Sequence, residues 1–401
     1  MSSSPAETAC RLCDGALDGG DLDLGEVPIC NRFTHDGGCE RHPLSMTACR
    51  SCGLIQLRRF PRPEAMTPLL PWIRYNEPDQ HLDAAVTRLL GLLARPPRRV
   101  LGTGPFDQPL LDRLTRNGAI AQAIDLRETH PPRQTTSIGT SYPYLETIQA
   151  RLSDGDLAAA AGEQADVVVC RYLLEHCHAP LDALRALGDA ATPDGVVIVE
   201  VPDCGSFLRR CDYSFPWEEH VSYFTETTLA AMASRAGFEV RDIIRSPGAL
   251  EDSLMAVLRR GGPQPLAARA SDREGLASFE IYRERFAPTG DAWARLVRTK
   301  TQNGGKVAVF GAGHQAIMFV NALGLNHSVT AMVDDNPDKL GMVAPGMTSP
   351  VISSAAMLAD PAFTTCLLAV SPRVEAAIMA KCAPLRDRGG HFHSIFESAP
   401  T

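Results

Sequence analysis

Apolar runs alternate with amphipathic segments from about residue 80 onward. Residues 81–94 (HLDAAVTRLLGLLA) carry apolar side chains at helical spacing, and residues 98–104 (RRVLGTG) form a short apolar run that ends in glycines. Residues 110–118 repeat the helical pattern, and residues 119–125 form a second apolar run. Such alternation is typical of a parallel sheet with helices on both faces. The pattern therefore predicts an α/β fold for the middle of the chain.

The same alternation continues and then changes. Residues 165–176 (ADVVVCRYLLEH) predict a strand that leads into the start of a helix, and residues 194–203 predict another buried strand. Residues 238–246 and 251–261 predict a closing antiparallel pair. Several crossovers followed by a hairpin are the layout of class I methyltransferases rather than of a typical dehydrogenase domain. The order of elements favours S-adenosylmethionine over NAD as the ligand of this Rossmann-like domain.

Glycines and one acidic residue mark the candidate cofactor site. Gly102 and Gly104 end the first strand, and Asp125 ends the second strand about 20 residues later. At that spacing a carboxylate accepts hydrogen bonds from the two hydroxyl groups of a ribose. Gly102, Gly104 and Asp125 are therefore the candidate cofactor-binding residues.

A second, smaller βαβ unit is expected near the C-terminus. A helical stretch over residues 271–301 precedes KVAVFGAGHQA, in which Gly311, Gly313 and Ala316 fit the G-x-G-x-x-A spacing, with Asp334 about 20 residues further on. Two interpretations stay open for this C-terminal Rossmann-like segment. It is either a dinucleotide site or a tight turn that needs glycine only for close backbone approach.

Four cysteines near the N-terminus form two close pairs. Cys10 and Cys13 stand in CRLC, and Cys49 and Cys52 stand in CRSC. Tetrahedral Zn²⁺ takes four thiolates, and two CxxC turns supply them. Four protein ligands leave no open position for water, so the expected zinc is structural. Among the remaining cysteines, Cys30 and Cys39 are the candidates for further ligands.

Composition bounds the domain count and excludes some partners. The chain has 401 residues, of which 44% are hydrophobic and 21% charged, enough for two or three domains with cores of their own. Its formal net charge of -8 argues against binding to nucleic acid or to an anionic membrane. The polar start MSSSPAET lacks the pattern of a signal peptide, which predicts a cytoplasmic protein.

The three patterns together predict three domains. The expected bounds are 1–66 for the zinc-binding module, 67–265 for the methyltransferase-like domain and 266–401 for the C-terminal Rossmann-like domain.

Five local motifs, in this order of segments, resemble the zinc-binding sugar C-methyltransferases that act on nucleotide-linked keto-deoxysugars. The motifs are CRLC with CRSCGLIQL, YLLEHCHAPLDAL, IVEVPD, WEEHVSYFTETTL and VDDNPDKLGMVAPG. The resemblance covers nearly the whole chain. It implies that S-adenosylmethionine and Zn²⁺ are the cofactors, that the partner is a small molecule of the nucleotide-sugar class, and that the enzyme serves antibiotic or secondary metabolite biosynthesis as a monomer or homodimer.

The resemblance also implies catalytic residues. His220 and Glu219 match the histidine and the adjoining carboxylate of the family motif, where they abstract a proton beside a ketone or polarise the ketone oxygen. Tyr75 is the candidate for a hydroxyl that relays a proton. Glu175 and His176, where a helix is expected to begin, are equally compatible with a capping role.

One loop departs from the family pattern. Family members carry E-x-G-x-N-D-G after the first strand, whereas this chain has RVLGTGPFDQPLL, without the acidic residue and with Asp107 further on. Two alternatives to methyl transfer to carbon therefore stay open. In one, the scaffold has lost S-adenosylmethionine and performs other chemistry or binding. In the other, the GAGHQA unit serves a dinucleotide-dependent oxidoreductase.

Overall fold

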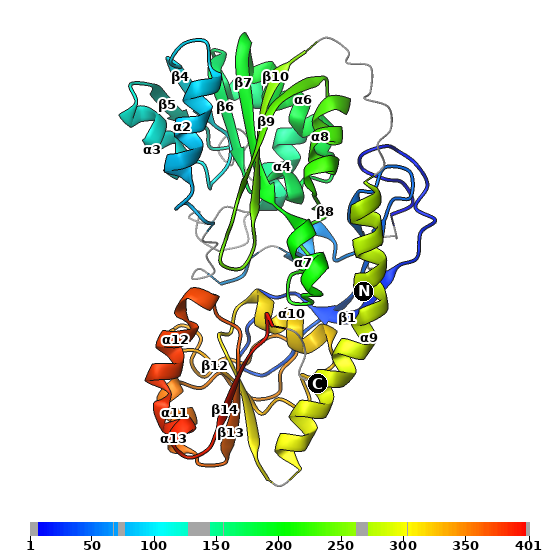
Figure 1. Cartoon of the computed structure of the whole chain (residues 1–401), viewed down its shortest axis with the longest axis vertical. Coiled ribbons are helices and arrows are strands. Elements are labelled where there is room, and N and C mark those ends of the chain that lie inside the picture. Colours follow the sequence, from blue (N-terminus) through cyan, green and yellow to red (C-terminus); the bar gives the residue numbers. More distant parts are fainter. Residues whose placement is uncertain are drawn as a thin grey trace.

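The computed structural model describes seven stretches of the chain, which contain three β-sheets (Figure 1). The described residues are 7–66, 68–70, 77–126, 145–154, 156–261, 272–302 and 304–397. Tyr75, the candidate proton-relay residue, lies outside them. Within these stretches, no helix is both long enough and apolar enough to cross a membrane.

The N-terminal sheet has four antiparallel strands in the order β1-β2-β3-β8. The strands are β1 (Leu22–Pro28), β2 (Arg41–Ala48), β3 (Ile55–Arg59) and β8 (Ser222–Tyr223), and the short helix α1 (Pro63–Met66) follows β3. Strand β8 comes from the WEEHVSYF motif, and Ile55 pairs with Tyr223. The candidate catalytic motif is therefore tied to the N-terminal segment by backbone pairing.

The six-stranded sheet occupies the upper half of the molecule in the view of Figure 1, and its strand order is β5-β4-β6-β7-β10-β9. Its strands are β4 (Arg99–Gly102), β5 (Ile120–Ala123), β6 (Ala165–Arg171), β7 (Ala191–Pro202), β9 (Phe238–Ser246) and β10 (Ser253–Arg260). Strands β5, β4, β6 and β7 are parallel, and β10 is antiparallel to both β7 and β9. The expected crossovers and closing antiparallel pair are confirmed.

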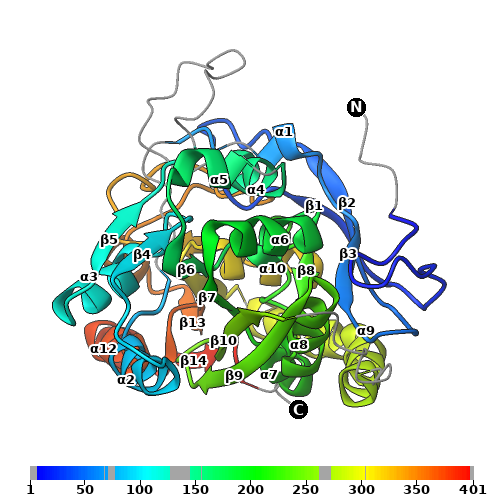
Figure 2. The same ribbon diagram turned by 90° about the horizontal axis from the view of Figure 1, so that it is seen from above.

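Helices cover both faces of this sheet, which is why its parallel strands are almost continuously apolar. The helices are α2 (Leu82–Leu92), α3 (Gln108–Arg116), α4 (Leu145–Ser153), α5 (Asp156–Ala161), α6 (Pro180–Ala190), α7 (Cys204–Arg210) and α8 (Glu226–Arg235). Helices α2 and α3 share one buried cluster with the sheet, and α4, α5, α6 and α8 share another. Figure 2 shows these two layers on opposite sides of the sheet.

The C-terminal sheet is parallel, in the order β12-β11-β13-β14. Its elements are β11 (Lys306–Phe310), α10 (His314–Ala322), β12 (Ala331–Val333), α11 (Ser354–Ala359), β13 (Phe363–Leu368), α12 (Pro372–Lys381), α13 (Ala383–Asp387) and β14 (His391–Ser394). The expected second βαβ unit is present as β11, α10 and β12.

Helix α9 (Arg273–Thr301) runs along one side of the molecule, from beside the six-stranded sheet to the C-terminal sheet (Figure 1). Its N-cap is Asp272, whose carboxylate accepts hydrogen bonds from Gly275 N (2.8 Å) and Thr225 Oγ1 (2.5 Å). Gly53 lies so close to this start that an added Cβ would come within 2.6 Å of Asp272 Cβ. The helix therefore begins against the second cysteine turn.

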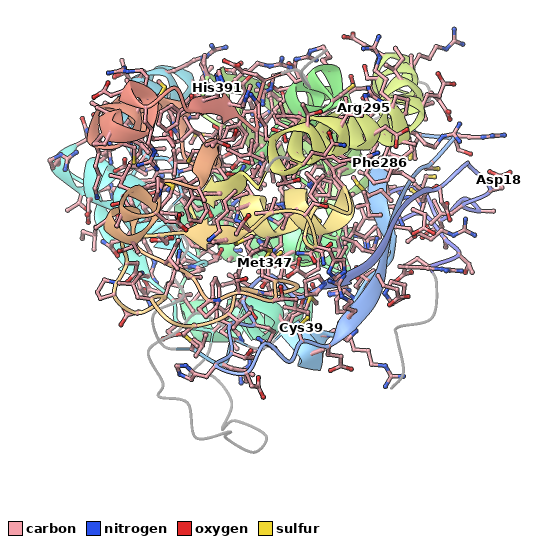
Figure 3. The ribbon with its side chains drawn as sticks, turned by 90° about the horizontal axis from the view of Figure 1, so that it is seen from below. Asp18, Cys39, Phe286, Arg295, Met347 and His391 are labelled. Atoms are coloured by element: carbon pink, nitrogen blue, oxygen red, sulfur yellow. The ribbon has the colours of Figure 1, made fainter. Side chains whose placement is uncertain are left out.

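Buried side chains join the segments into one packed structure. The largest apolar cluster takes residues from the N-terminal sheet, from the segment 204–223 and from the C-terminal sheet. Backbone bonds between Thr34 and Val343, at 3.2 and 2.6 Å, add to this contact. Figure 3 shows the molecule from below, where Cys39, a candidate for a further zinc ligand, lies far from Asp18, a residue that follows the first cysteine pair in sequence.

Candidate functional site

The four paired cysteines converge on one point. The Sγ atoms of Cys10, Cys13, Cys49 and Cys52 all lie within 4.8 Å of one another. Cys10 Sγ is 3.5 Å from Cys52 Sγ, and Cys13 Sγ is 3.5 Å from Cys49 Sγ. Four sulfurs around Zn²⁺ at the usual bond length would be roughly 3.8 Å apart. The thiol set therefore fits a tetrahedral zinc site, whereas Cys30 and Cys39 are not in this cluster.

Each cysteine pair sits on the same kind of turn. After the first pair, Asp14 has a φ of 58° and its N–H bonds to Cys10 O at 2.9 Å. After the second pair, Gly53 has a φ of 86° and its N–H bonds to Cys49 O at 2.7 Å. A residue in the left-handed region reverses the chain and brings both thiols to the same side.

The cysteine turns also contribute to the core of the six-stranded sheet. Cys10, Leu12, Cys49 and Leu54 belong to the same buried cluster as helices α6 and α8. Loss of the metal would therefore disturb the packing of the central sheet as well as the turns. This placement agrees with a structural role for zinc.

The candidate cofactor residues lie where the sheet order reverses. Strand β4 stands between β5 and β6, and ligands of open parallel sheets bind beside the carboxyl ends of strands at such a point. Gly102 ends β4, where a Cβ would come within 2.7 Å of Leu111 Cδ1, so glycine permits α3 to pack closely. Gly104 is half-buried, and Asp125 is half-buried just after β5. A glycine turn and a carboxylate at this edge fit the ribose and backbone contacts of S-adenosylmethionine.

Asp107 stabilises the divergent loop after β4 by hydrogen bonds to backbone amides. Its buried carboxylate accepts hydrogen bonds from the backbone N–H groups of Thr103 (2.7 Å), Gly104 (2.8 Å) and Arg171 (2.8 Å). It thereby ties the turn after β4 to the end of β6. In the structure the Asp107 carboxylate therefore holds the divergent loop in place.

A buried ion pair lies beside that loop. Arg171 Nε is 2.5 Å from Glu200 Oε2, and His81 Nε2 is 2.5 Å from Glu200 Oε1. Arg171 also donates hydrogen bonds to Phe106 O (2.6 Å) and Pro78 O (2.7 Å). The guanidinium group therefore connects the ends of β6 and β7 with the loop after β4 and the segment before α2.

The WEEHVSYF segment is held rigidly by its own side chains. Tyr223 Oη accepts a hydrogen bond from Trp217 N (3.0 Å) and donates one to Trp217 O (3.2 Å), and His220 N also bonds to Trp217 O (3.1 Å). Glu218 is buried and accepts from Cys30 N at 2.6 Å. Glu219 is 4% exposed and accepts from Asn31 Nδ2 at 3.4 Å. The Tyr223 hydroxyl group thus has a structural role, because it binds the backbone of Trp217.

Three histidines gather around Trp217, and this group is called the histidine cluster. The ring of His220 lies 4.7 Å from the rings of both His176 and Trp217, measured between centroids. The ring of His314 stacks on Trp217 at 4.8 Å, with 23° between the planes. His314 begins α10, so the GAGHQA turn of the C-terminal sheet meets the candidate catalytic motif.

Burial keeps two of these imidazoles neutral. It lowers the pKa of His220 well below its usual value and the pKa of His176 to about 3. His220 stays half-buried, so its ring remains accessible to a ligand. A neutral, accessible imidazole is suited to accepting a proton.

Glu175 and His176 lie in a short 3-10 helix (Leu174–His176), and not at the start of the next α-helix. Helix α6 begins only at Pro180. The expectation that Glu175 or His176 starts that helix is therefore wrong, because Pro180 occupies the first turn, where its missing N–H costs nothing. Both residues are 2% exposed. No side-chain hydrogen bond caps the described start of α6.

The glycine turn after β11 uses its acidic residue internally. Asp334 Oδ2 accepts hydrogen bonds from Ala312 N (3.1 Å) and Lys339 Nζ (2.7 Å). Gly311 has a φ of 99°, and a Cβ there would lie 2.6 Å from Ala369 O. These contacts favour the interpretation as a tight turn over the interpretation as a dinucleotide site.

Models of three protein families match consecutive segments of the chain. Residues 10–66 match the "Putative zinc binding domain", residues 74–243 the "Methyltransferase domain" and residues 267–396 the "C-methyltransferase C-terminal domain". The C-methyltransferase NovU of Streptomyces niveus is 26% identical over 378 residues, which cover 86% of this chain and 85% of that protein. The chain belongs to the zinc-binding C-methyltransferase family. It is thus an S-adenosylmethionine-dependent C-methyltransferase.

Other relatives match less than half of this C-methyltransferase. The Ubiquinone biosynthesis O-methyltransferase of Aeromonas salmonicida is 24% identical over 156 residues, 36% of this chain and 65% of that protein. Among solved structures, the Burkholderia thailandensis 1,6-didemethyltoxoflavin-N1-methyltransferase is 20% identical, with a TM-score of 0.32, and the match covers 46% of this chain and 79% of that one. The prediction of S-adenosylmethionine and zinc as cofactors agrees with the family assignment.

The sequence singled out His220 and Glu219 but did not connect them with His314 or Trp217. The sequence signal of His314 and Trp217 is weak, because a histidine inside GAGHQA looks like part of a glycine turn and Trp217 looks like a core residue.

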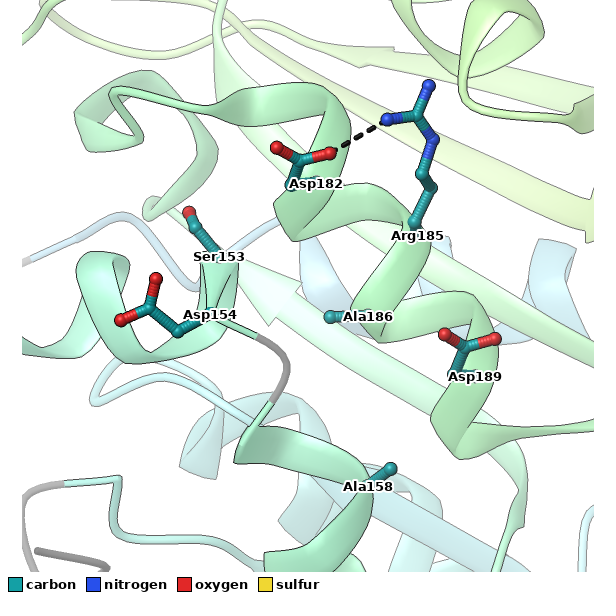
Figure 4. Close-up of a pocket in the computed structure, with 7 residues that line it drawn as sticks. All are labelled: Ser153, Asp154, Ala158, Asp182, Arg185, Ala186 and Asp189. Atoms are coloured by element: carbon teal, nitrogen blue, oxygen red, sulfur yellow. Dashed lines mark hydrogen bonds and ion pairs between the residues drawn. The ribbon is translucent and has the colours of Figure 1, made fainter.

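A shallow hollow of about 200 Å³ between α4, α5 and α6 is lined by none of the candidate residues (Figure 4). Its Asp182–Arg185 ion pair, at 2.7 Å, is an ordinary surface contact.

Proposed function

We propose that this C-methyltransferase methylates a carbon beside the ketone of a nucleotide-linked sugar, by way of an enolate. The observation that supports this most is His220, a neutral and half-buried imidazole beside Glu219. A carbon acid needs a positioned base, because the proton must leave before the carbon can attack a methyl group. Methyl transfer to oxygen or nitrogen makes a weaker demand on such a base.

Within this proposal His220 removes the proton. The backbone bond of His220 N to Trp217 O, together with the contacts of its ring to His176 and Trp217, fixes where the imidazole lies. Glu219 is held in place by a hydrogen bond from Asn31 Nδ2 at 3.4 Å. The role of Tyr75 as a proton relay stays a prediction.

S-adenosylmethionine supplies an electrophilic methyl group when bound. Gly104 and Asp125 would hold it at the carboxyl ends of β4 and β5, where Asp125 accepts hydrogen bonds from ribose hydroxyl groups. Asp107 keeps the turn of Gly104 in shape through its bonds to the Thr103 and Gly104 amides. The missing acidic residue of the family loop is thus offset by a carboxylate from within the loop.

The acceptor would lie against the histidine cluster, with part of it on the C-terminal sheet. His314 is exposed and stacks on Trp217, so a sugar near His220 also meets the turn after β11. The similarity to NovU, a C-methyltransferase, and the family resemblance support a nucleotide-linked keto-deoxysugar.

Hydrogen exchange separates enolate formation from methyl transfer. Nucleotide-linked keto-deoxysugars are incubated with the enzyme and S-adenosylhomocysteine in D₂O, and NMR follows deuterium at the carbon beside the ketone. Wild type is expected to exchange this position and, with S-adenosylmethionine, to add one methyl group to the same carbon. His220→Ala should lower both rates by roughly 100- to 10,000-fold.

His178→Ala provides a matched control. His178 Nε2 bonds to Glu146 Oε2 at 3.1 Å and is not part of the histidine cluster, so both rates should stay near those of wild type. Methylation on oxygen, or exchange that does not depend on His220, would contradict the proposal.

A further inference from the structure

We propose that Glu175, His176 and His220 form a second divalent-metal site, separate in place and chemistry from the cysteine site. One ligand atom of each residue lies within 4.8 Å of the other two. Two imidazoles and one carboxylate form a donor set that Zn²⁺, Fe²⁺ and Co²⁺ accept, with positions left open for water or substrate.

Glu175 brings a buried carboxylate to this group. Glu175 is 2% exposed, and neither of its two carboxylate oxygens has a hydrogen-bond partner among the described residues. Buried polar groups without partners are rare, because each costs about 1–3 kcal/mol of stability. A cation between Glu175 and the two imidazoles would satisfy this group.

His176 is oriented as metal-binding histidines usually are. Its ring donates a hydrogen bond to the backbone of Glu219, while Nδ1 is buried and has no partner in the described part of the chain. Nε2 is therefore the donor, and Nδ1 carries the free lone pair. Ligating histidines typically donate the other ring N–H to a carbonyl or carboxylate, which fixes the tautomer.

The surroundings of Glu175 favour a cation. Glu77, Glu200 and Glu251 lie near Glu175, so four carboxyl groups gather at this place. Among these carboxylates, Glu200 is compensated by Arg171 and His81. A divalent cation held by Glu175 would relieve the remaining repulsion.

A metal at this site would occupy the lone pair that His220 needs as a base. This consequence rests on the proposed function, in which His220 removes the proton. Binding of the metal should therefore inhibit methyl transfer, and the inhibition should weaken as the acceptor concentration rises, because the acceptor occupies the same place.

Cobalt titration tests the site without any measurement of activity. The holoprotein, with zinc in the cysteine site, is titrated with Co²⁺, and absorbance and metal content are recorded. We expect one further equivalent of Co²⁺ with the weak d–d bands of a nitrogen and oxygen site, and without the intense charge-transfer band of a thiolate site. Glu175→Gln should weaken this binding by more than roughly 100-fold.

His220→Asn is the second variant, because His220 is half-buried and its replacement disturbs packing less. It should lose the same equivalent of Co²⁺, while His178→Asn should keep it. Failure of zinc-replete wild type to bind Co²⁺, or binding that neither variant weakens, would overturn the site.

The activity measurement is kept separate. Inhibition by Co²⁺ that disappears in Glu175→Gln supports the link to catalysis. Co²⁺ that binds without inhibiting overturns that link and leaves the binding site in place. Absence of methyl transfer from every keto-sugar, by contrast, counts against the proposed function alone.

Discussion

The two ligand-rich groups of this chain differ in how their polar atoms are satisfied. The cysteine site brings four thiols to the spacing of a tetrahedral metal and lies in the same buried cluster as helices α6 and α8. The histidine cluster and Glu175 contain buried polar atoms that have no hydrogen-bond partner among the residues that the structure describes, such as Glu175 Oε1 and His176 Nδ1. The first arrangement stabilises the fold, whereas the second costs stability and keeps groups ready for a ligand.

Cys49→Ala tests the stabilising side of this comparison and should have the largest effect. Loss of one thiolate opens the zinc site, and metal binding in such sites contributes directly to folding. The free energy of unfolding should fall by more than about 4 kcal/mol, with loss of zinc, as measured by denaturant unfolding and metal analysis. Cys366→Ala, which removes a buried thiol outside the cluster, should keep its zinc. A Cys49→Ala protein with full zinc content and stability would refute the structural assignment.

His220→Ala tests the other side, because it should affect chemistry and leave the fold in place. Turnover should fall by roughly 100- to 10,000-fold through loss of the base. The free energy of unfolding should change by less than about 1 kcal/mol, because His220 is half-buried. Steady-state kinetics and denaturant unfolding of the same preparation measure both. Unchanged turnover would remove His220 from the mechanism.

Tyr223→Phe tests whether a residue of the WEEHVSYF segment contributes to stability more than to turnover. The substitution removes the hydroxyl that bonds both to Trp217 N and to Trp217 O, and leaves a buried N–H without its acceptor. The free energy of unfolding should fall by about 1–3 kcal/mol. Turnover should fall less than in His220→Ala, because the base remains. Wild-type stability in this variant would show that the WEEHVSYF segment is held by packing alone.

Glu251→Gln should have the smallest effect and concerns pH. Burial, with repulsion from Glu77, raises the pKa of Glu251 from 4.5 to about 8. The unfolded chain loses this proton near pH 4.5 and the folded chain only near pH 8, so the group makes stability fall as pH rises between these values. In Glu251→Gln, the free energy of unfolding should therefore decrease less between these pH values, as measured by denaturant unfolding at a series of pH values.

Glu239→Gln is the control for the pH measurement. Arg259 lowers the pKa of Glu239, so its contribution to stability changes only below its ordinary pKa of 4.5. The slope between pH 4.5 and pH 8 should therefore stay as in wild type. An equal slope in Glu251→Gln and in wild type would mean that Glu251 does not cost the fold stability.

Much of the fold followed from local patterns. Apolar runs, glycine turns and helical spacing predicted β4, β5, β6, β7 and the closing pair β9 and β10, because each depends on neighbours in sequence. The two CxxC turns were equally readable, since a zinc knuckle is a local structure. The expected domain bounds stay predictions.

The candidate site was predictable only in part. His220 and Glu219 were found through their resemblance to a family motif, and Gly102, Gly104 and Asp125 through their spacing. The start of α6 was misplaced, because the short 3-10 helix around Glu175 has no distinct pattern in sequence. Tyr223 could not be assigned, because its partner is the backbone of Trp217.

The sequence by itself determined the zinc ligands, the order of strands and helices, and the family, since these depend on residue type and spacing along the chain. Only the tertiary structure decided that His314 stacks on Trp217, that the Asp107 carboxylate binds the amides of the cofactor turn, and that Glu175 is buried beside His176 and His220. These contacts join residues far apart in sequence, and burial, which sets their charge, exists only after the sheets have packed together.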